Sequence, residues 1–249
     1  RCLAAEGEHH RAPVADLARI ATAAGVDLAA VYPAAELAHA QAHANERVDI
    51  GTRAYDVVFT RDRRTDIAQA AAPPEAARRM EQIHDEAVAE TVAALERWVG
   101  YVMVGHHGDG QQTQRVDTTG IIATATKHRT ARAMTAGEPG DPHTHTHVMI
   151  SVMGRSTVDG KWRTIAAGGR DLMRHVATLG EMQRAIERRK LSEEFGFRYA
   201  RDPQTGQWEL VGIPDVVKNG FSRRRNQAKE VAGPDAPGAA SRAAARRLA

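Results

Sequence analysis

Three histidines stand at alternate positions in segment 141–152, which is otherwise rich in β-branched and apolar residues. They are His143, His145 and His147. Histidine is the side chain that most often binds metals in proteins, and alternate residues of a strand point to the same face. The spacing predicts a strand that projects all three imidazoles from one face, while apolar residues such as Val148 and Ile150 fill the other.

A fourth histidine, His128, ends the upstream segment 118–128, which also has the character of a strand. If the two strands are antiparallel neighbours joined by loop 133–142, His128 lies beside the histidine row. Burying several imidazoles without a metal or partners would be costly, so the cluster favours a metal site with open positions for chemistry. From the residues alone, zinc, manganese, nickel and copper fit such a site equally well.

Length and charge set the limits of the interpretation. The 249 residues are enough for one large domain or two small ones, and 34 basic against 31 acidic residues leave a net charge of +3. Segment 221–249 carries seven basic and two acidic residues; it could follow a phosphate backbone or be a solvated helix end. A single cysteine, Cys2, and the lack of an apolar run that could span a bilayer predict a cytoplasmic protein.

Helices and strands are interleaved along the chain, which predicts an α+β fold: an antiparallel sheet with flanking helices. The predicted helices lie within 1–48, at 75–99, at 170–195 and from Pro214 through 225. The predicted strands lie at 54–60, 118–128, 142–152, 197–199 and 208–211, with a hairpin turn at Asp159-Gly160. The polar stretch 61–66 is expected to be a loop. Residues 1–231 would form one domain and 232–249 a basic linker or tail.

One acid interrupts the apolar strand at 54–60. Asp56 stands where a hydrophobic residue would be expected, and a carboxylate inside a strand is costly unless it has a partner. The sequence leaves two interpretations, a partnered functional carboxylate or a solvent-facing residue on an edge strand.

Six features occur in a recognisable order along the chain. They are the strand with Asp56, the amphipathic helix 75–99, Val116-Asp117-Thr118-Thr119-Gly120, His128-Arg129-Thr130-Ala131-Arg132, Asp141-Pro142-x-x-His145-Thr146-His147 with Asp159-Gly160-Lys161-Trp162-Arg163 after it, and Phe221-Ser222-Arg223-Arg224. This set resembles the relaxase domain of the MobF-type conjugative relaxases, the TrwC/TraI family, in its actinobacterial form. The resemblance covers residues 1–229.

The resemblance implies a palm-like antiparallel sheet of the HUH relaxase/Rep type. It implies an enzyme that nicks one DNA strand at a transfer origin through a tyrosine, which stays attached to the 5′ phosphate. The implied partners are single-stranded DNA at that origin and a helicase domain further along the full-length protein. The implied cofactor is a divalent metal ion, magnesium or manganese first, with zinc or nickel as alternatives.

Site residues follow from the resemblance position by position. His128, His145 and His147 match the metal ligands, and Asp56 matches the catalytic aspartate that helps to deprotonate the tyrosine. Arg132 and Arg63 are implied to contact DNA; Arg63 stands in for a lysine of the family, and a structural salt bridge is the alternative for Arg132. His143 takes a non-ligand position, which makes it an outer or DNA-facing histidine.

The chain as given departs from the family at the nucleophile. The family's catalytic tyrosines lie near the N-terminus, and Tyr32, Tyr55, Tyr101 and Tyr199 are not in that motif. We therefore expect metal and DNA binding without nicking, from a truncated piece of an active relaxase or from a decaying gene. Gln183 also stands where an aromatic residue would be expected.

Two other functions fit parts of the sequence. One is a non-catalytic remnant of a relaxase that binds single-stranded DNA. The other is a histidine-triad nucleotide hydrolase, because the spacing of residues 143–147 matches that motif. The second alternative explains neither His128 nor Asp56, and a motif without its structural context is weak support.

Overall fold

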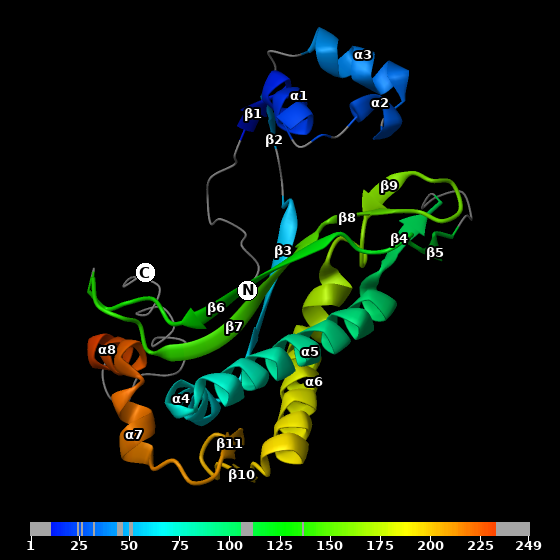
Figure 1. The fold of residues 1–249 in the computed structure, drawn as a ribbon. Helices are drawn as coiled ribbons and strands as arrows, with labels where there is room; N and C mark the ends of the chain where they lie inside the picture. Colours follow the sequence, from blue (N-terminus) through cyan, green and yellow to red (C-terminus); the bar gives the residue numbers. More distant parts are fainter. Residues whose placement is uncertain are drawn as a thin grey trace. The chain divides into compact units, whose positions relative to one another are not determined.

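The computed structural model describes residues 11–232, apart from residues 24, 26, 32, 44–46, 50–51, 106–111 and 136. By its internal contacts the chain divides into two compact units, residues 2–55 and residues 56–249, joined within one strand (Figure 1). The predicted tail from residue 233 onward, and the histidines at 106 and 107, lie outside the described residues.

The first unit combines short helices with a two-stranded antiparallel ribbon. Its elements are β1 (Arg11–Pro13), α1 (Val14–Ala23), α2 (Leu28–Val31), α3 (Ala34–Ala42) and β2 (Arg47–Asp49), with β1 paired to β2. The predicted end of the first helix at Gly25 is confirmed, since Gly25 has a left-handed φ of +67°. The ribbon was not predicted, because strands of three residues carry too little alternation to be recognised.

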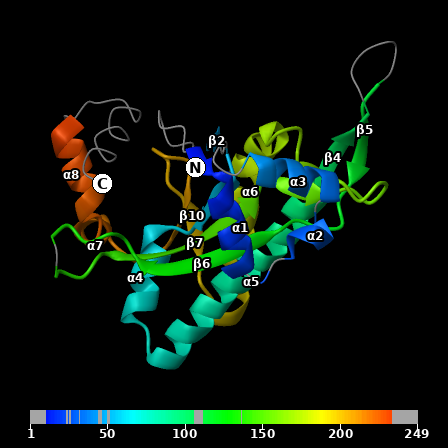
Figure 2. The ribbon, with the colours of Figure 1, turned by 90° about the horizontal axis from the view of Figure 1, so that it is seen from above.

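A three-stranded sheet in the order β3-β7-β6 is the centre of the second unit (Figures 1 and 2). β3 is Ala54–Thr60, β6 is Ala123–Thr130, and β7 is Pro142–Ser151. The strand predicted at 118–128 begins later than expected and continues to Thr130. Gly120 has a φ of +135°, a conformation outside the strand region, so the residues before Ala123 leave the ladder.

Three helices cover one face of this sheet, as Figures 1 and 2 show. They are α4 (Arg63–Ala71), α5 (Pro74–Val99) and α6 (Arg170–Phe195). The two long helices were predicted correctly, including the end of α6 at Gly196, where φ is +67°.

The prediction of a loop at 61–66 was wrong, because α4 begins there. Asp62 is the N-cap of α4, and its carboxylate accepts hydrogen bonds from the backbone N–H groups of Arg64 and Thr65 at 3.0 and 3.1 Å. The helix is short and polar, so it has no apolar stripe to reveal it.

Three hairpins and two short helices complete the second unit. They are β4 (Tyr101–Val104) with β5 (Gln114–Asp117), β8 (Met153–Arg155) with β9 (Trp162–Thr164), β10 (Tyr199–Arg201) with β11 (Trp208–Leu210), then α7 (Asp215–Gly220) and α8 (Arg223–Ala232). The hairpin around Asp159-Gly160 is confirmed. The single helix predicted from Pro214 is two helices, α7 and α8, because Phe221 and Ser222 between them are not helical.

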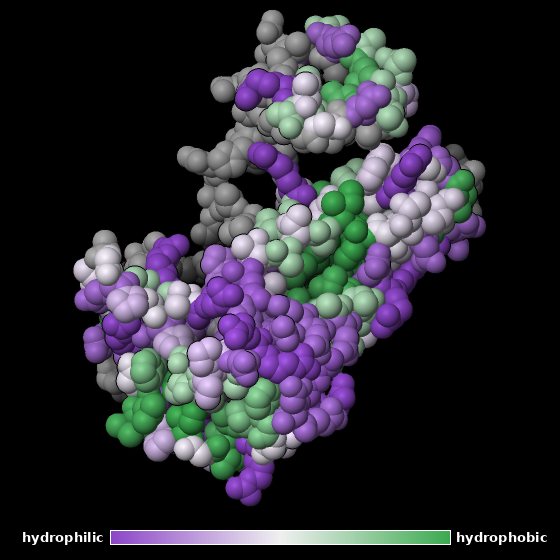
Figure 3. Space-filling view, viewed as in Figure 1, coloured by the Kyte–Doolittle hydropathy of each residue, from purple (hydrophilic) through white to green (hydrophobic). Residues whose placement is uncertain are grey.

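The core of the second unit lies between the sheet and the long helices. One cluster is formed by Met80 and Ile83 of α5 with Leu191 of α6, each at most 1% exposed, packed against Phe195 and Phe197. The outer sides of α5 and α6 are hydrophilic (Figure 3). The predicted α+β class with antiparallel strands is confirmed. No helix in the described part of the chain is long and apolar enough to cross a membrane.

Candidate functional site

The histidine row of β7 lies on the face of the sheet opposite the helices. Burial alternates strictly along the strand from His143: Thr144, Thr146, Val148 and Ile150 are buried, while the residues between them are partly exposed. This alternation is the one predicted from the sequence. His143, His145 and His147 therefore share one face of β7.

The antiparallel register brings the fourth histidine to the row. His128 of β6 is directly opposite His145, and Thr126 is opposite His147. The ring centres of His128, His145 and His147 lie 5.1–5.4 Å apart in all three pairs. Because directly opposite residues of an antiparallel pair point to the same face, the three imidazoles form one cluster.

Two of these rings are oriented by oxygen acceptors on Nδ1. The Nδ1 atom of His147 lies 2.9 and 3.0 Å from the two carboxylate oxygens of Asp56, a β3 residue only 4% exposed. The Nδ1 atom of His145 lies 2.9 Å from the carbonyl oxygen of His143. With Nδ1–H donated to oxygen, each ring keeps a lone pair on Nε2. Burial lowers the pKa of His145, which favours the neutral ring.

The spacing of the three rings bears on whether they fit a metal. A nitrogen about 2.1 Å from a metal puts its ring centre roughly 3.2 Å away, so three ligating rings have centres about 4.6–5.2 Å apart. The observed spacings of 5.1–5.4 Å lie at the upper end of this range or just above it. Among the described residues, no group of three or more His, Cys, Asp or Glu side chains is already arranged to hold a metal ion. His128 is exposed and His145 and His147 are partly exposed, so an ion has access to all three rings from solvent.

The other residues singled out in the sequence lie around this cluster or away from it. His143 lies beside it, its Nδ1 3.3 Å from a carboxylate oxygen of Asp66. Arg63 donates from Nη1 to the carbonyl oxygen of Pro142, at the beginning of β7. Arg132 is exposed after the end of β6.

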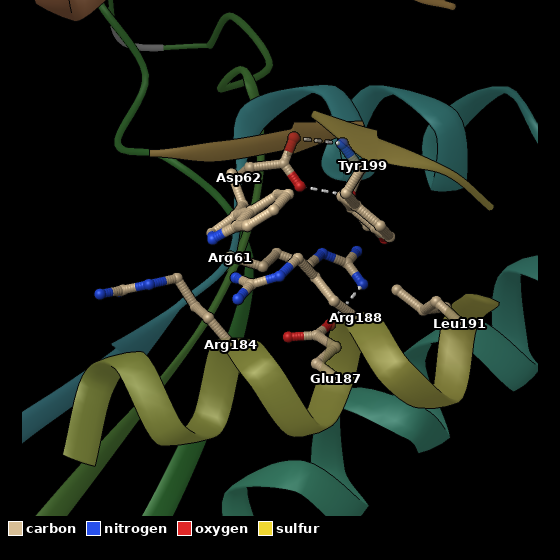
Figure 4. Close-up of a pocket in the computed structure, with 9 residues that line it drawn as sticks. Arg61, Asp62, Arg184, Glu187, Arg188, Leu191 and Tyr199 are labelled. Atoms are coloured by element: carbon tan, nitrogen blue, oxygen red, sulfur yellow. Dashed lines mark hydrogen bonds and ion pairs between the residues drawn. The ribbon is translucent and has the colours of Figure 1, made fainter. Parts of the chain in front are cut away.

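Beneath β7, on the helix side, lies a network of buried charges that the sequence did not reveal. The guanidinium of Arg61 donates to Asp66 at 2.9 Å, to Glu187 at 3.1 Å and to the hydroxyl of Thr144 at 3.0 Å. Asp66 also accepts from the backbone N–H of Thr144 at 2.9 Å. Figure 4 shows Glu187 rising from α6 toward Arg61, whereas Arg184 points away from this pair. The network therefore anchors the strand between two of its histidines.

His84 of α5 extends this network to the next residue of β7 on the helix side. Its two ring nitrogens lie 3.2 Å from Glu187 and 3.1 Å from the hydroxyl of Thr146. His84 has zero exposure, so it is a buried residue of the helix–sheet interface rather than a solvent-facing one. Gln183, also fully buried, donates to Glu187 at 2.6 Å, so a polar partner occupies the position where an aromatic residue was expected.

The network should make the protein sensitive to acid. Burial opposes the ionisation of Glu187, but His84 and Arg61 outweigh it, so the pKa of Glu187 lies below its ordinary 4.5. Asp66 behaves alike: burial opposes its ionisation, His143 and Arg61 outweigh it, and its pKa lies below 3.8. The unfolded chain therefore takes up protons first as the pH falls.

We expect the stabilisation from these two carboxylates to be complete above about pH 4.5 and to be lost progressively below it. Thermal unfolding between pH 7 and pH 3.5 measures the effect. A Glu187→Gln variant should be less stable at pH 7 and lose less stability on acidification than the parent. Glu193→Gln, on the exposed side of α6, should follow the parent. Equal acid sensitivity in the parent and Glu187→Gln would contradict the prediction.

Two of the described tyrosines form hydrogen bonds with residues outside the histidine cluster. The hydroxyl of Tyr101 donates to Asp171, and burial followed by this hydrogen bond raises its pKa. The hydroxyl of Tyr199 lies 3.3 Å from that of Thr65, and burial raises its pKa. Tyr55 precedes Asp56 on β3, so its side chain points to the opposite face of the strand.

The sheet, the facing helices and the paired histidines of β7 define the class of the protein as an HUH-fold protein. A family model described as TrwC relaxase matches residues 5–249. The chain belongs to the TrwC relaxase family. This assignment replaces the histidine-triad alternative. A comparison with curated proteins finds no match.

Solved structures of one relaxase have the same fold. The conjugative relaxase TrwC bound to oriT DNA, in a metal-bound form and in a copper-bound form, matches with a TM-score of 0.64 and 22% identity. TrwC with a 27-mer DNA comprising the recognition hairpin and the cleavage site matches with a TM-score of 0.63 and 22% identity. All three matches cover 82% of this chain. They cover 65%, 64% and 67% of the TrwC chains, so this chain spans about two thirds of their length or slightly less.

Proposed function

We propose that His128, His145 and His147 bind one divalent metal ion through their Nε2 atoms. The observation that carries this proposal is the register that sets His128 opposite His145, with His147 next to both and the Nδ1 atoms of His145 and His147 held by oxygen. The metal-bound TrwC structures support it. Magnesium or manganese is our first assignment, and zinc or nickel is the alternative.

Asp56 would act through His147. A carboxylate on Nδ1 fixes the tautomer and the orientation of the ring and makes Nε2 a stronger ligand. A carboxylate beside the metal ligands can also accept directly the proton that a nucleophilic hydroxyl loses. We assign Asp56 this double role.

The function that this site supports best is that of a conjugative relaxase, which nicks one DNA strand at a transfer origin by tyrosine transesterification. When bound, a divalent ion would polarise the scissile phosphate and stabilise the charge that develops there. The histidines hold the ion and leave positions open for phosphate oxygens, and Arg63 and Arg132 contribute positive charge for the DNA. The TrwC complexes with oriT DNA support this proposal.

Calorimetric titration with manganese tests the site directly. We expect one ion to bind per chain and to be removed by EDTA, and each of the single variants His128→Ala, His145→Ala and His147→Ala to bind more weakly than the parent. A stoichiometry of zero, or an affinity that does not depend on any of the three histidines, would contradict the proposal.

An Asp56→Asn variant should bind manganese about 10- to 100-fold more weakly than the parent, because it loses the charged acceptor on Nδ1 of His147. The same titration measures the effect. Asp117→Asn is the matched control, since Asp117 is exposed at the end of β5, which pairs with β4 in a different sheet from the strands that carry the histidines. An affinity equal to that of the parent would remove Asp56 from the site.

A second candidate function is single-stranded DNA binding without cleavage. It is favoured because the hydroxyls of Tyr101 and Tyr199 form hydrogen bonds elsewhere, and because the side chain of Tyr55 points to the other face of β3. A gel assay for a covalent adduct with oligonucleotides spanning the transfer origin distinguishes the two. We expect DNA binding without an adduct from this chain alone, since none of these three tyrosines faces the histidines. An adduct would show that another tyrosine reaches the metal site and would establish nicking.

A further inference from the structure

A cavity of about 260 Å³ adjoins the histidine row at the beginning of β7. His143 forms part of its wall, and the ring of His143 stacks on that of His145 with centres 4.7 Å apart. The remaining wall comes from the end of β3, the beginning of α4, and from α6, β11, α7 and α8. The cavity therefore lies beside the proposed metal site, while none of the three proposed ligands lines it.

The lining has an excess of positive charge. Five basic residues meet only two acidic ones there, Asp62 and Glu209. Three of the five are balanced: Arg61 by its buried carboxylates, Lys218 by Glu209 at 2.7 Å and Arg184 by Glu181 at 2.6 Å. The other two basic residues are Arg63 and Arg225, so an anion would be attracted to their side of the cavity.

Within the described part of the chain, Arg63 is held in place by an uncharged partner and makes no ion pair. Its Nη1 donates to the carbonyl oxygen of Pro142, an uncharged acceptor. This hydrogen bond holds the guanidinium at the beginning of β7. Arg225 is exposed in the first turn of α8. A guanidinium offers several N–H donors in a plane and matches the paired oxygens of a phosphate.

The wall next to Arg63 is rigid. The Nδ1 atom of His143 lies 3.3 Å from a carboxylate oxygen of Asp66. Asp66 in turn accepts hydrogen bonds from Arg61 and from the backbone N–H of Thr144. Each of these hydrogen bonds limits the freedom of the His143 ring. The side of the cavity that faces the proposed metal site is therefore preorganised.

An aromatic ring completes the lining. Trp208 of β11 is 42% exposed, and the guanidinium of Arg188 lies 5.7 Å from its ring centre. Basic grooves that also present aromatic faces are suited to single-stranded nucleic acid, whose phosphates and bases they bind separately. An inorganic anion would use the arginines alone, so the combination points to a nucleotide.

We propose that this cavity is a nucleotide subsite for single-stranded DNA. Arg63 and Arg225 bind one phosphodiester group, Trp208 stacks on a base, and His143 forms the wall toward the metal site. This proposal rests on the proposed relaxase function, since it places one nucleotide of the strand next to the nucleotide that the metal site holds.

The test is the anisotropy of a fluorescein-labelled oligothymidylate of about 20 nucleotides, titrated with the full chain in EDTA at several salt concentrations. Arg225→Ala should weaken binding and lower the slope of log affinity against log salt by about 0.7, the value for one phosphate contact to a single strand. Arg225→Lys should retain the slope of the parent. Trp208→Ala should weaken binding on the order of tenfold with the slope unchanged, and Trp208→Phe should restore most of the loss.

Arg174→Ala is the matched control, because Arg174 is an exposed arginine of α6 outside this cavity and loses the same charge. We expect it to bind like the parent. The subsite is overturned if Arg225→Ala and Trp208→Ala both bind like the parent, if Arg174→Ala lowers the slope as much as Arg225→Ala, or if the parent does not bind the oligonucleotide at low salt. Because EDTA removes the metal, these outcomes are independent of manganese titration, which tests the proposed function.

Discussion

Replacing both His145 and His147 with alanine is expected to abolish manganese binding while the protein stays folded. The double variant removes two of three proposed ligands, and a single imidazole does not hold a divalent ion in water. Both side chains are partly exposed, so little packing is lost. The main cost to folding is that the buried carboxylate of Asp56 loses a hydrogen-bond donor, about 1–3 kcal/mol.

Calorimetric titration with manganese measures the affinity, and circular dichroism of the metal-free protein measures the fold. His39→Ala with His43→Ala is the matched control, because it removes two imidazoles at the end of α3, where the ring of His39 stacks on that of the C-cap residue His43 with centres 4.2 Å apart. This control should bind manganese like the parent. Unchanged manganese affinity in the His145/His147 double variant would refute the assignment of the metal site.

Replacing Arg61 with alanine is expected to lower the free energy of unfolding by about 3–5 kcal/mol, because it leaves buried carboxylates without their counter-charge. The side chains of Asp66 and Glu187 are each 1% exposed and both lose this partner. Thr144 loses a donor as well. Since Thr144 lies between His143 and His145, we also expect weaker manganese binding.

Urea denaturation measures the loss of stability. Arg61→Lys keeps the charge but not the planar fork that reaches several acceptors, so it should fall between the parent and Arg61→Ala. Arg79→Ala serves as the control: Arg79 binds Glu194 and Glu86 on the outer sides of α5 and α6, where side chains are screened by solvent. If Arg61→Ala is no less stable than Arg79→Ala, the buried network does not support β7.

The helices and strands that the sequence predicted well are those with a long or regular apolar pattern. The stripe of α5, the glycine that ends α6 and the alternation of β7 all follow from local spacing. α4 was missed because its charged residues resemble a loop. Two of these charged residues have partners far away in the chain, Glu209 for Arg64 and His143 for Asp66, and no local pattern reveals such partners.

The family resemblance supplied residues that spacing could not assign. His128 was linked to the row by a hypothesis about register, which the pairing of β6 with β7 now bears out. Asp56 was only an acid in a strand, with two interpretations left open. Its contact with His147 joins positions 91 residues apart, a separation at which sequence spacing carries no geometric information.

By itself the sequence determined that three imidazoles lie on one face of a strand, because alternation is a property of the extended backbone. It also determined the positions of the long helices. Only the tertiary structure decided which carboxylates back the histidines, and that Arg61 and Glu187, 126 residues apart, lie beneath them. These contacts depend on how the sheet packs on α4, α5 and α6, and packing is decided by the whole chain rather than by any segment of it.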